Sequence, residues 1–356
     1  MASVKQSQNT RGIICVTITL LGWSSVLLFL RHLHTEIDGW TANGWRYGMC
    51  ALVLLPMVLA KQAQGQVQAS IWWRAIVPAV FNCFGQVCFG FSVYYIEPGL
   101  AGFLLRVALI SSTLGAFVLF ADERPLLRSP IFWGGMFLVA AGSVGTVALG
   151  IHPIQGATAR GVLLGAAAGA FFGLYGVSVR YWMRGVPSVL SFAAISNYTA
   201  LVMVGLMLCY SETQGGAVFD LSPMNLTFLV LSAFLGIAIG HIAYYASIAR
   251  LGVAVASAVV QLAPFIGGAA SVFVFGEILT LGQWGSGLIM LVGSALLLCA
   301  ERRRPRDADV VQPAFPVELE DAGDPCALAA EASSPVDDTA GGKASEHQAP
   351  DLEGCR

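Results

Sequence analysis

The second half of this chain repeats a pattern found in the first half. In the first copy, Glu123 follows a Phe-Ala-Asp run and is followed by a Trp-Gly pair and, eight residues later, by Gly142. In the second copy, Glu277 follows a Phe-Gly pair and is again followed by Trp-Gly and, eight residues later, by Gly293. The first copy has three additional residues after its glutamate, but the order is the same. The pattern predicts two structurally related halves.

The composition indicates that both halves span a membrane. Hydrophobic residues make up 56% of the chain and charged residues only 11%, and the mean hydropathy is +0.72. Soluble domains carry about 25% charged residues, so this composition argues against a water-soluble protein. Apolar stretches of roughly 20 residues are long enough to cross a bilayer. The sequence contains ten of them, at residues 12–30, 40–60, 75–95, 98–121, 131–150, 161–182, 189–210, 226–248, 254–276 and 281–300.

An odd number of spans in each half has a topological consequence. The halves, 12–150 and 161–300, hold five predicted spans each, so the second half enters the membrane in the opposite orientation. Inverted repeats are typical of alternating-access carriers, whose solute site lies near the midplane between the repeats. We therefore expect an all-α membrane protein of ten transmembrane helices, built as two inverted five-helix repeats.

The distribution of Lys and Arg predicts the orientation of the chain. With the N-terminal segment 1–11 in the cytoplasm, the inner segments hold thirteen Lys and Arg residues and the outer loops only Arg31 and Arg160. Both termini are therefore expected on the cytoplasmic side of the inner or plasma membrane. The C-terminal segment 301–356 becomes rich in Asp, Glu, Ala, Pro and Gly after Arg306. It cannot bury enough apolar surface to offset its ordering entropy, so we expect a disordered acidic tail.

Short motifs in both halves are similar to those of a known family. In the second half they are Leu251–Ala254, Gln261–Pro264, Phe275–Glu277, Gln283–Gly285 and Gly293. In the first half the looser matches are Trp23, Trp45–Tyr47, Leu54–Pro56 and Glu123. In their order and doubling, these motifs resemble the drug/metabolite transporter superfamily, in its EamA-like branch. The resemblance covers residues 12–300.

The resemblance implies a ten-helix carrier that moves small metabolites, often amino acids and related compounds, commonly outward. It also implies a central cavity lined largely by helices three, four, eight and nine. Two positions depart from the family pattern when the two glutamates are aligned. Ile110 then stands opposite Pro264, so the first half lacks the proline of helix nine. Arg106 stands opposite Val260, and an arginine in helix four is not expected of the family.

Three ionisable side chains fall well inside predicted spans, away from the span ends, where such groups are costly and are functional candidates. Arg106 lies roughly 12 Å below the outer boundary, and its planar guanidinium fits a carboxylate or phosphate in a bidentate way. We expect it to bind an anionic group of the solute; the alternative is a structural partner such as Glu97. Arg46 lies nearer the outer boundary and is expected to be structural. His241 either carries a coupling proton or hydrogen-bonds across helices in its neutral form.

Uncharged polar residues are expected to complete the site. Asn82 and Gln86 lie one turn apart on the third span, and Tyr245 lies one turn from His241 on the eighth. Gln261 lies on the ninth span and offers a neutral hydrogen-bonding group. The predicted solute-binding residues are Arg106, Asn82, Gln86, His241, Tyr245 and Gln261.

Other residues are expected to act on the structure rather than on the solute. Pro264 removes one backbone hydrogen bond from helix nine and can bend it, which suits a gating helix. Glu123 and Glu277 lie at helix ends and are expected to cap helices or form ion pairs. A glycine at every fourth position from Gly161 to Gly173 allows close packing of the sixth span, inside the protein or, as the alternative, in a homodimer.

The function favoured by these observations is secondary transport of a small polar metabolite such as an amino acid or another carboxylate, by export or exchange, with protons as a candidate coupling ion. A membrane enzyme is disfavoured because no Gly-x-Ser-x-Gly, no His-Glu-x-x-His and no pair of intramembrane aspartates is present. A channel or a lipid scramblase remains an alternative. No metal, cofactor or nucleic acid is expected; the eight cysteines form no Cys-x-x-Cys.

Overall fold

The computed structural model describes residues 2–150, 156–251, 256 and 259–302, and the regular elements there are helical. The last described helix continues to Arg302. The acidic tail expected after it lies outside the described residues.

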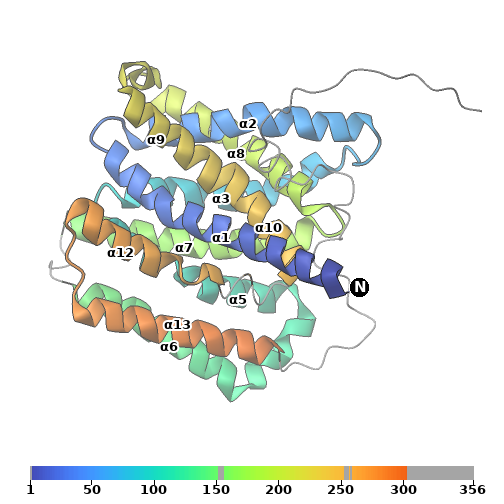
Figure 1. Cartoon of the computed structure of the whole chain (residues 1–356), viewed down its shortest axis with the longest axis vertical. Coiled ribbons are helices and arrows are strands. Elements are labelled where there is room, and N and C mark those ends of the chain that lie inside the picture. Colours follow the sequence, from blue (N-terminus) through green and yellow to red (C-terminus); the bar gives the residue numbers. More distant parts are fainter. Residues whose placement is uncertain (1, 151–155, 252–255, 257–258, 303–356) are drawn as a thin grey trace, which may run out of the picture. The chain divides into compact units, whose positions relative to one another are not determined.

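Twelve α-helices and three shorter helical segments form this part of the chain (Figure 1). The shorter segments are the 3-10 helices η1 (Ala121–Arg128) and η2 (Gly216–Asp220) and the π-helix η3 (Phe234–Ala238). The α-helices are α1 (Ala2–Leu33), α2 (Gly39–Ala63), α3 (Ile71–Ser92), α4 (Pro98–Leu104), α5 (Val107–Leu119), α6 (Pro130–Ala148), α7 (Ala157–Trp182), α8 (Ser188–Tyr210), α9 (Pro223–Ala233), α10 (Ile239–Leu251), α12 (Ala263–Phe275) and α13 (Leu281–Arg302).

Eight segments of the described chain are long and apolar enough to cross a membrane. They are Thr10–Leu33, Ile71–Ser92, Pro98–Leu119, Pro130–Ala148, Thr158–Trp182, Ser188–Tyr210, Pro223–Ile248 and Leu281–Ala300. Two of the ten expected spans are not among them. The second, α2, has 25 residues but carries Asn43 and Arg46 in its first half. The ninth is represented by α12, which has only 13 residues because the helix is interrupted before it.

Local sequence explains where several helices begin. The carboxylate of Asp38 accepts hydrogen bonds from the backbone N–H groups of Trp40 and Thr41 at the start of α2. Ser129 and Ser222 do the same at the starts of α6 and α9, and a proline follows each serine at the first helical position. An N-cap side chain satisfies N–H groups that have no partner in the helix, and proline has no N–H to satisfy.

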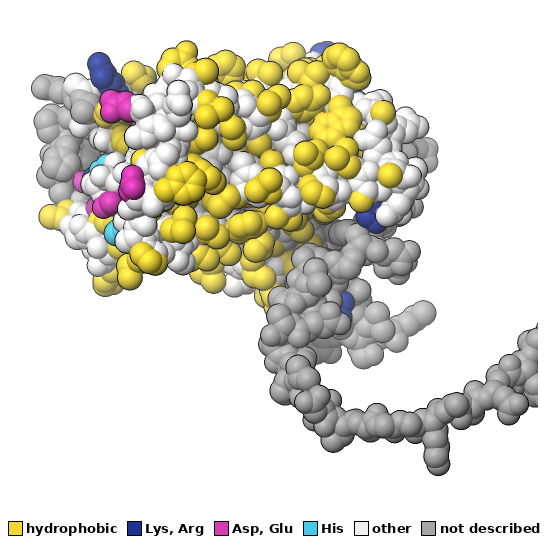
Figure 2. Space-filling view, turned by 90° about the horizontal axis from the view of Figure 1, so that it is seen from above, with side chains coloured by type: hydrophobic (Ala, Val, Ile, Leu, Met, Phe, Trp, Pro, Cys, Tyr) yellow, Lys and Arg dark blue, Asp and Glu magenta, His cyan; other side chains and the backbone are white. Residues whose placement is uncertain are grey.

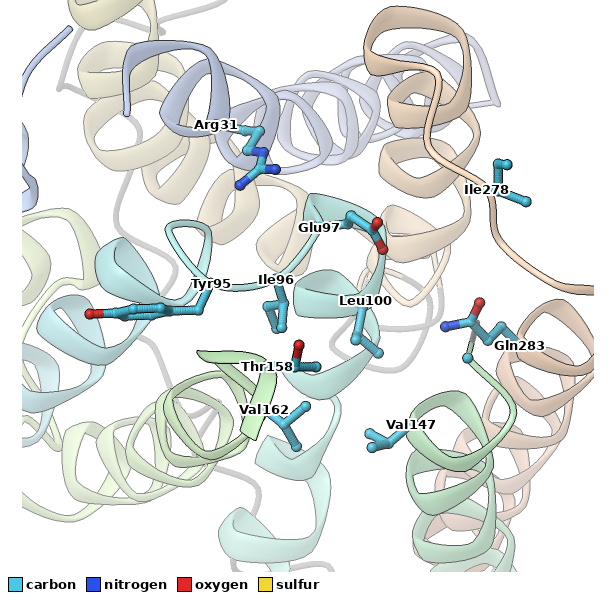
Figure 3. Close-up of a pocket in the computed structure, with 11 residues that line it drawn as sticks. Arg31, Tyr95, Ile96, Glu97, Leu100, Val147, Thr158, Val162, Ile278 and Gln283 are labelled. Carbon is cyan, nitrogen blue, oxygen red and sulfur yellow. The ribbon is translucent and has the colours of Figure 1, made fainter. Parts of the chain in front are cut away.

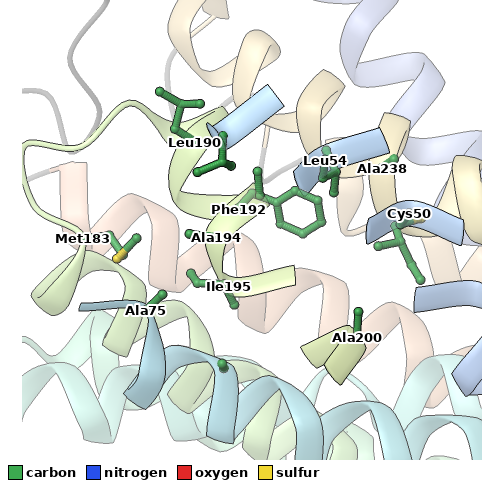
Figure 4. Packing of buried hydrophobic residues seen from close by; sticks show 14 of the residues in the cluster. Cys50, Leu54, Ala75, Met183, Leu190, Phe192, Ala194, Ile195, Ala200 and Ala238 are labelled. Atoms are coloured by element: carbon green, nitrogen blue, oxygen red, sulfur yellow. The ribbon is translucent and has the colours of Figure 1, made fainter. Parts of the chain in front are cut away.

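Helix pairs that are distant in sequence lie side by side. α6 packs along α13, α3 along α7, α2 along α8, and α1 along α10. Figure 1 shows the α6–α13 pair along one side of the bundle. A large apolar core forms where α2, α3 and α8 meet; it includes Leu54, Ala75, Phe192 and Ile195 (Figure 4).

The glycines at every fourth position of α7 pack within the same chain, against the loop that precedes α4 and against α4 and α5. A Cβ atom on Gly169 would lie 2.8 Å from the carbonyl oxygen of Leu104, and one on Gly173 would lie 2.4 Å from that of Ala108. Both distances are shorter than van der Waals contact, so only glycine allows the two backbones to approach this closely. The stripe therefore positions α4 and α5 against α7.

The surface of the helices suits a lipid environment. Figure 2 shows apolar side chains over the broad middle of one face, with acidic and histidine side chains gathered at one end. Large apolar side chains exposed on different helices include Leu52, Phe137, Leu163, Leu201 and Phe273. Soluble monomers rarely expose contiguous apolar areas of this extent.

Candidate functional site

Two interrupted helices meet near the middle of the bundle. The fourth span, called helix four, consists of α4 and α5 and is interrupted between them at Leu105 and Arg106. The ninth span is interrupted at Gln261 and Leu262, just before α12. At these places i→i+3 bonds occur, as from Arg106 N to the Phe103 oxygen and from Leu262 N to the Val259 oxygen, both 3.0 Å. The guanidinium of Arg106 donates a hydrogen bond to the side-chain oxygen of Gln261. The contact thus joins the two interruptions directly.

The two interruptions differ in local sequence and in surroundings. In the ninth span, Pro264 occupies the first turn of α12, where its missing N–H costs nothing but where a continuous helix would clash with its ring. Helix four has no proline at the corresponding Ile110. Instead, Gly169 of α7 lies against the carbonyl groups of Leu104 and Leu105. Irregular backbone is tolerated at membrane depth only where protein or a polar cavity surrounds it.

An aromatic cluster surrounds His241 on α10. Its ring stacks on Phe192 with centroids 4.4 Å apart and planes 9° apart, and the centroid of Trp23 lies 5.1 Å away. Nδ1 of His241 lies 2.9 Å from the carbonyl oxygen of Ile237, a geometry in which Nδ1 carries the hydrogen. The ring centroid of Tyr244 lies 5.1 Å from that of Trp23, and Tyr244 is also near Arg106. The cluster is therefore continuous with the Arg106–Gln261 contact.

The π-helix η3 directly precedes α10, and the side chain of Arg46 packs against it. The Arg46 side chain is 1% exposed; Nη1 donates to Asn43 Oδ1 at 3.2 Å, and Nη2 lies 3.5 Å from the carbonyl oxygen of Ser232. A Cβ on Gly236 of η3 would lie 3.5 Å from the same Nη2. π-Helical turns inside α-helices are frequent at functional sites. Arg46 thus joins α2 to the irregular segment that leads to His241.

The two predicted polar residues of α3 have different surroundings. Nδ2 of Asn82 donates to Thr199 Oγ1 at 2.9 Å and to the Tyr47 hydroxyl at 3.3 Å, which ties α3 to α8 and α2. Gln86 is 7% exposed, and its Oε1 has no hydrogen-bond partner among the described residues. Gln86 therefore has unused hydrogen-bonding capacity, whereas the Asn82 amide is engaged within the protein.

The structure brings four predicted residues into one continuous neighbourhood. Arg106 contacts Gln261, and Tyr244 connects this pair to the aromatic cluster of His241. Tyr245 lies beside Phe192, with ring centroids 6.5 Å apart, and interacts with Tyr175. The aromatic residues Trp23, Tyr175, Phe192 and Tyr244 were not among the predicted solute-binding residues, because one aromatic residue in a span looks like ordinary packing.

Several buried polar atoms around these residues lack a hydrogen-bond partner within the described chain. They are Arg106 Nε, Gln86 Oε1 and Trp23 Nε1. Leaving such atoms unpaired costs about 1–3 kcal/mol each, so in native proteins they are usually satisfied by water or a ligand. The donors predominate, which favours a solute that supplies oxygen acceptors.

Charged residues gather at one end of the bundle, formed by residues 31–38, 93–97 and 275–280 and called the vestibule end below. A cavity of about 560 Å³ there is lined by Arg31, Glu97 and Glu277, among others, and a neighbouring cavity of about 230 Å³ shares Arg31 and Glu97. Burial, together with nearby Glu97, raises the pKa of the Glu277 carboxyl. The sequence did not single out Arg31, because nothing in a loop arginine shows which distant loops it meets.

Two further predictions concern Glu123 and metal binding. Glu123 lies in η1, but its side chain is outside the described part of the structure. Among the described residues, no group of three or more His, Cys, Asp or Glu side chains is arranged to hold a metal ion.

Comparison with known proteins gives the family. No curated protein matches the chain. A solved structure titled only "Crystal structure of protein" is 15% identical, with a TM-score of 0.57 over 82% of this chain and 98% of that one, which shows likeness of fold alone. The model of the EamA-like transporter family matches residues 10–148 and again residues 159–299, once in each half. Because these matches cover most of its length, the chain belongs to the EamA-like transporter family of the drug/metabolite transporter superfamily.

Proposed function

We propose that this membrane protein carries a small polar metabolite bearing a carboxylate, by alternating access between two inverted halves. Membership of the family implies a secondary transporter rather than an enzyme. The single observation that carries the finer proposal is the contact between Arg106 and Gln261 across the two helix interruptions.

The chemistry of this contact favours an anionic solute group. Gln261 is neutral, so it accepts a hydrogen bond from Arg106 without neutralising the charge. A guanidinium presents several N–H donors in one plane, and a carboxylate can accept two of them at once. A solute carboxylate would therefore replace the amide oxygen of Gln261 and gain the charge interaction in addition.

The remaining predicted residues would shape the site around that anchor. Gln86 offers an unpaired amide oxygen, which suits an ammonium or hydroxyl group of the solute. The aromatic cluster of His241 and Tyr245 forms an adjoining wall. Asn82 would act through Tyr47 and Thr199 by fixing α3, and His241 is a candidate for coupling to protons.

Alternating access is supported by the arrangement of the short helices. α4 and α12 pack against each other, and a Cβ on Gly102 would lie 3.6 Å from the Cα of Pro264. α4 begins at the vestibule end and α12 ends there, so these two short helices from different halves run in opposite directions. Short segments joined by a single irregular turn can move separately from their continuations, with Pro264 at the joint.

The Lys and Arg distribution supports an orientation with both termini in the cytoplasm of the inner or plasma membrane, so that the vestibule end faces outward. Export or exchange of the solute is proposed from the family resemblance and does not depend on the orientation. A channel or scramblase is the second candidate; it would conduct without saturating and would show no counterflow.

Counterflow in proteoliposomes tests the proposal. Labelled amino acids, organic acids and sugars are offered to wild type, Arg106→Gln, Gln261→Glu and the control Arg160→Gln, which removes an exposed arginine of α7. We expect saturable exchange of carboxylate solutes, reduced about 10–100-fold in both site variants, because one loses the cation and the other neutralises it internally. Arg160→Gln should behave as wild type. Equal exchange of neutral solutes by wild type and Arg106→Gln would contradict the anion site.

A further inference from the structure

The vestibule end contains a buried carboxylate, that of Glu277, and neither the proposed solute site nor helix packing explains why it is buried. Glu277 lies between α12 and α13, is 8% exposed and lines the cavity of about 560 Å³. Neither of its carboxylate oxygens makes a well-formed hydrogen bond among the described residues, and the nearby Ser271 hydroxyl and Gly99 backbone offset only part of the cost of burial. An ionised carboxylate in such a place loses its hydration without full compensation, so the neutral, protonated form is favoured there.

Charged and titratable groups around Glu277 come from two other elements. Glu97, just before α4, disfavours the ionised form of Glu277, and Arg31, at the end of α1, favours it. Arg31 is held by a hydrogen bond of 2.7 Å from its Nη1 to the carbonyl oxygen of Val93. Figure 3 shows Arg31 and Glu97 around the smaller of the two cavities.

Two histidines line the larger cavity and have partners of their own. Nε2 of His32 lies 3.0 Å from Asn225 Oδ1, and Nδ1 of His34 pairs with the carbonyl oxygen of Arg31. Burial lowers the pKa of His34. His34 is therefore a rival source of pH dependence that an experiment must separate from Glu277.

Glu277 lies beside a close contact between α4 and α12. A Cβ on Gly99 of α4 would lie 3.3 Å from Ser271 Oγ, 3.4 Å from Gly268 Cα and 3.0 Å from Leu279 Cδ1. Glu277 interacts with both Ser271 and the backbone of Gly99, so it touches each side of this contact. Separation of α4 from α12 would admit water to the carboxylate.

We propose that Glu277 is a proton-binding site that holds the vestibule end closed while it is protonated. The proton comes from water in the vestibule, binds one carboxylate oxygen while α4 and α12 are in contact, and returns to that water when they separate. The inference goes beyond the proposed function, because it concerns the proton and does not depend on which solute Arg106 binds.

The direction of the pH effect follows from linkage. Burial raises the pKa of Glu277 in the closed arrangement, whereas a hydrated Glu277 would titrate near its ordinary 4.5. The closed arrangement therefore binds the proton more tightly, and it is favoured as the pH falls. Opening is favoured as the pH rises through the raised pKa of the closed arrangement.

Labelling of a buried reporter measures this opening without any solute. Ser271→Cys places a thiol in the α4–α12 contact at a position that is 0% exposed. Purified protein is treated with a charged thiol reagent from pH 5 to pH 8, and modification at position 271 is read by peptide mass spectrometry, so the native cysteines can stay. Rates are divided by those at Gln68→Cys, an exposed position that lines neither cavity, to remove the pH dependence of the thiol itself.

Four variants in this background isolate the group responsible. In Glu277→Gln the side chain at position 277 is neutral at every pH, and Glu277→Asp keeps a carboxylate on a shorter side chain. His34→Gln removes the histidine with a lowered pKa. Glu36→Gln makes the same chemical change as Glu277→Gln at an exposed glutamate and is the matched control.

We expect normalised labelling of wild type to rise at least about fivefold between pH 5 and pH 8. It should stay slow throughout in Glu277→Gln and keep a pH dependence in Glu277→Asp, His34→Gln and Glu36→Gln. A flat wild-type profile would overturn the proposal, as would an unchanged profile in Glu277→Gln or the loss of the profile in His34→Gln. If Glu277→Gln does not fold, the wild-type and Glu277→Asp profiles still decide.

Discussion

At the scale of single residues, Arg46 shows how a charge is accommodated inside the bundle. Its two terminal nitrogens, Nη1 and Nη2, lie in one plane and reach the Asn43 side chain and the Ser232 carbonyl group, respectively. Lysine has the same charge but no planar fork, so it cannot serve both acceptors from one position. We predict that Arg46→Lys lowers the free energy of unfolding by about 1–3 kcal/mol, measured by thermal unfolding in detergent. Arg160→Lys, at an exposed position, should leave the midpoint unchanged, and equal midpoints for all three proteins would show that the fork is dispensable.

At the scale of elements, α7 holds helix four in its interrupted form. Gly169 faces the carbonyl groups of Leu104 and Leu105, and an added methyl group would meet backbone rather than a movable side chain. We predict that Gly169→Ala displaces α4, lowers stability by about 1–3 kcal/mol and weakens solute binding at the neighbouring Arg106. Gly176→Ala is the matched control on the same helix, because a Cβ there meets nothing within 4 Å. Thermal unfolding and counterflow are compared for both variants; if both behave alike, α7 does not position helix four.

At the scale of the whole molecule, the charge distribution predicts the orientation in the membrane. The loop that contains Thr35 follows α1, and the loop that contains Gln68 follows α2, so the two must lie on opposite sides if both helices cross. In intact cells, a membrane-impermeant thiol reagent should label Thr35→Cys and should label Gln68→Cys only after permeabilisation. Both side chains are exposed, so burial does not explain a difference. Labelling of Gln68→Cys alone would reverse the assigned orientation.

Hydropathy and local capping account for what the sequence predicts well. Eight of the expected spans are present as long apolar helices, and Ser129 and Ser222 start helices before prolines, as local chemistry requires. The interruption before α12 is foreshadowed by Pro264. The interruption of helix four has no such residue in its own sequence; Gly169 of α7, which lies against it, is more than sixty residues further along the chain.

The candidate site likewise has features that the sequence predicts and features that it does not. Rarity inside an apolar span is enough to single out Arg106 and His241, since burying an ionisable group is costly wherever the helix packs. Tertiary structure alone decides three contacts: Arg106 meets Gln261, Phe192 stacks on His241, and Glu277 is buried beside α4. The physical reason is that helix formation depends on neighbours within a few residues, whereas these contacts depend on how the surfaces of separate helices fit together. The sequence by itself determined the family, the helical class and the candidate charges; the packing decided which partner each of them has.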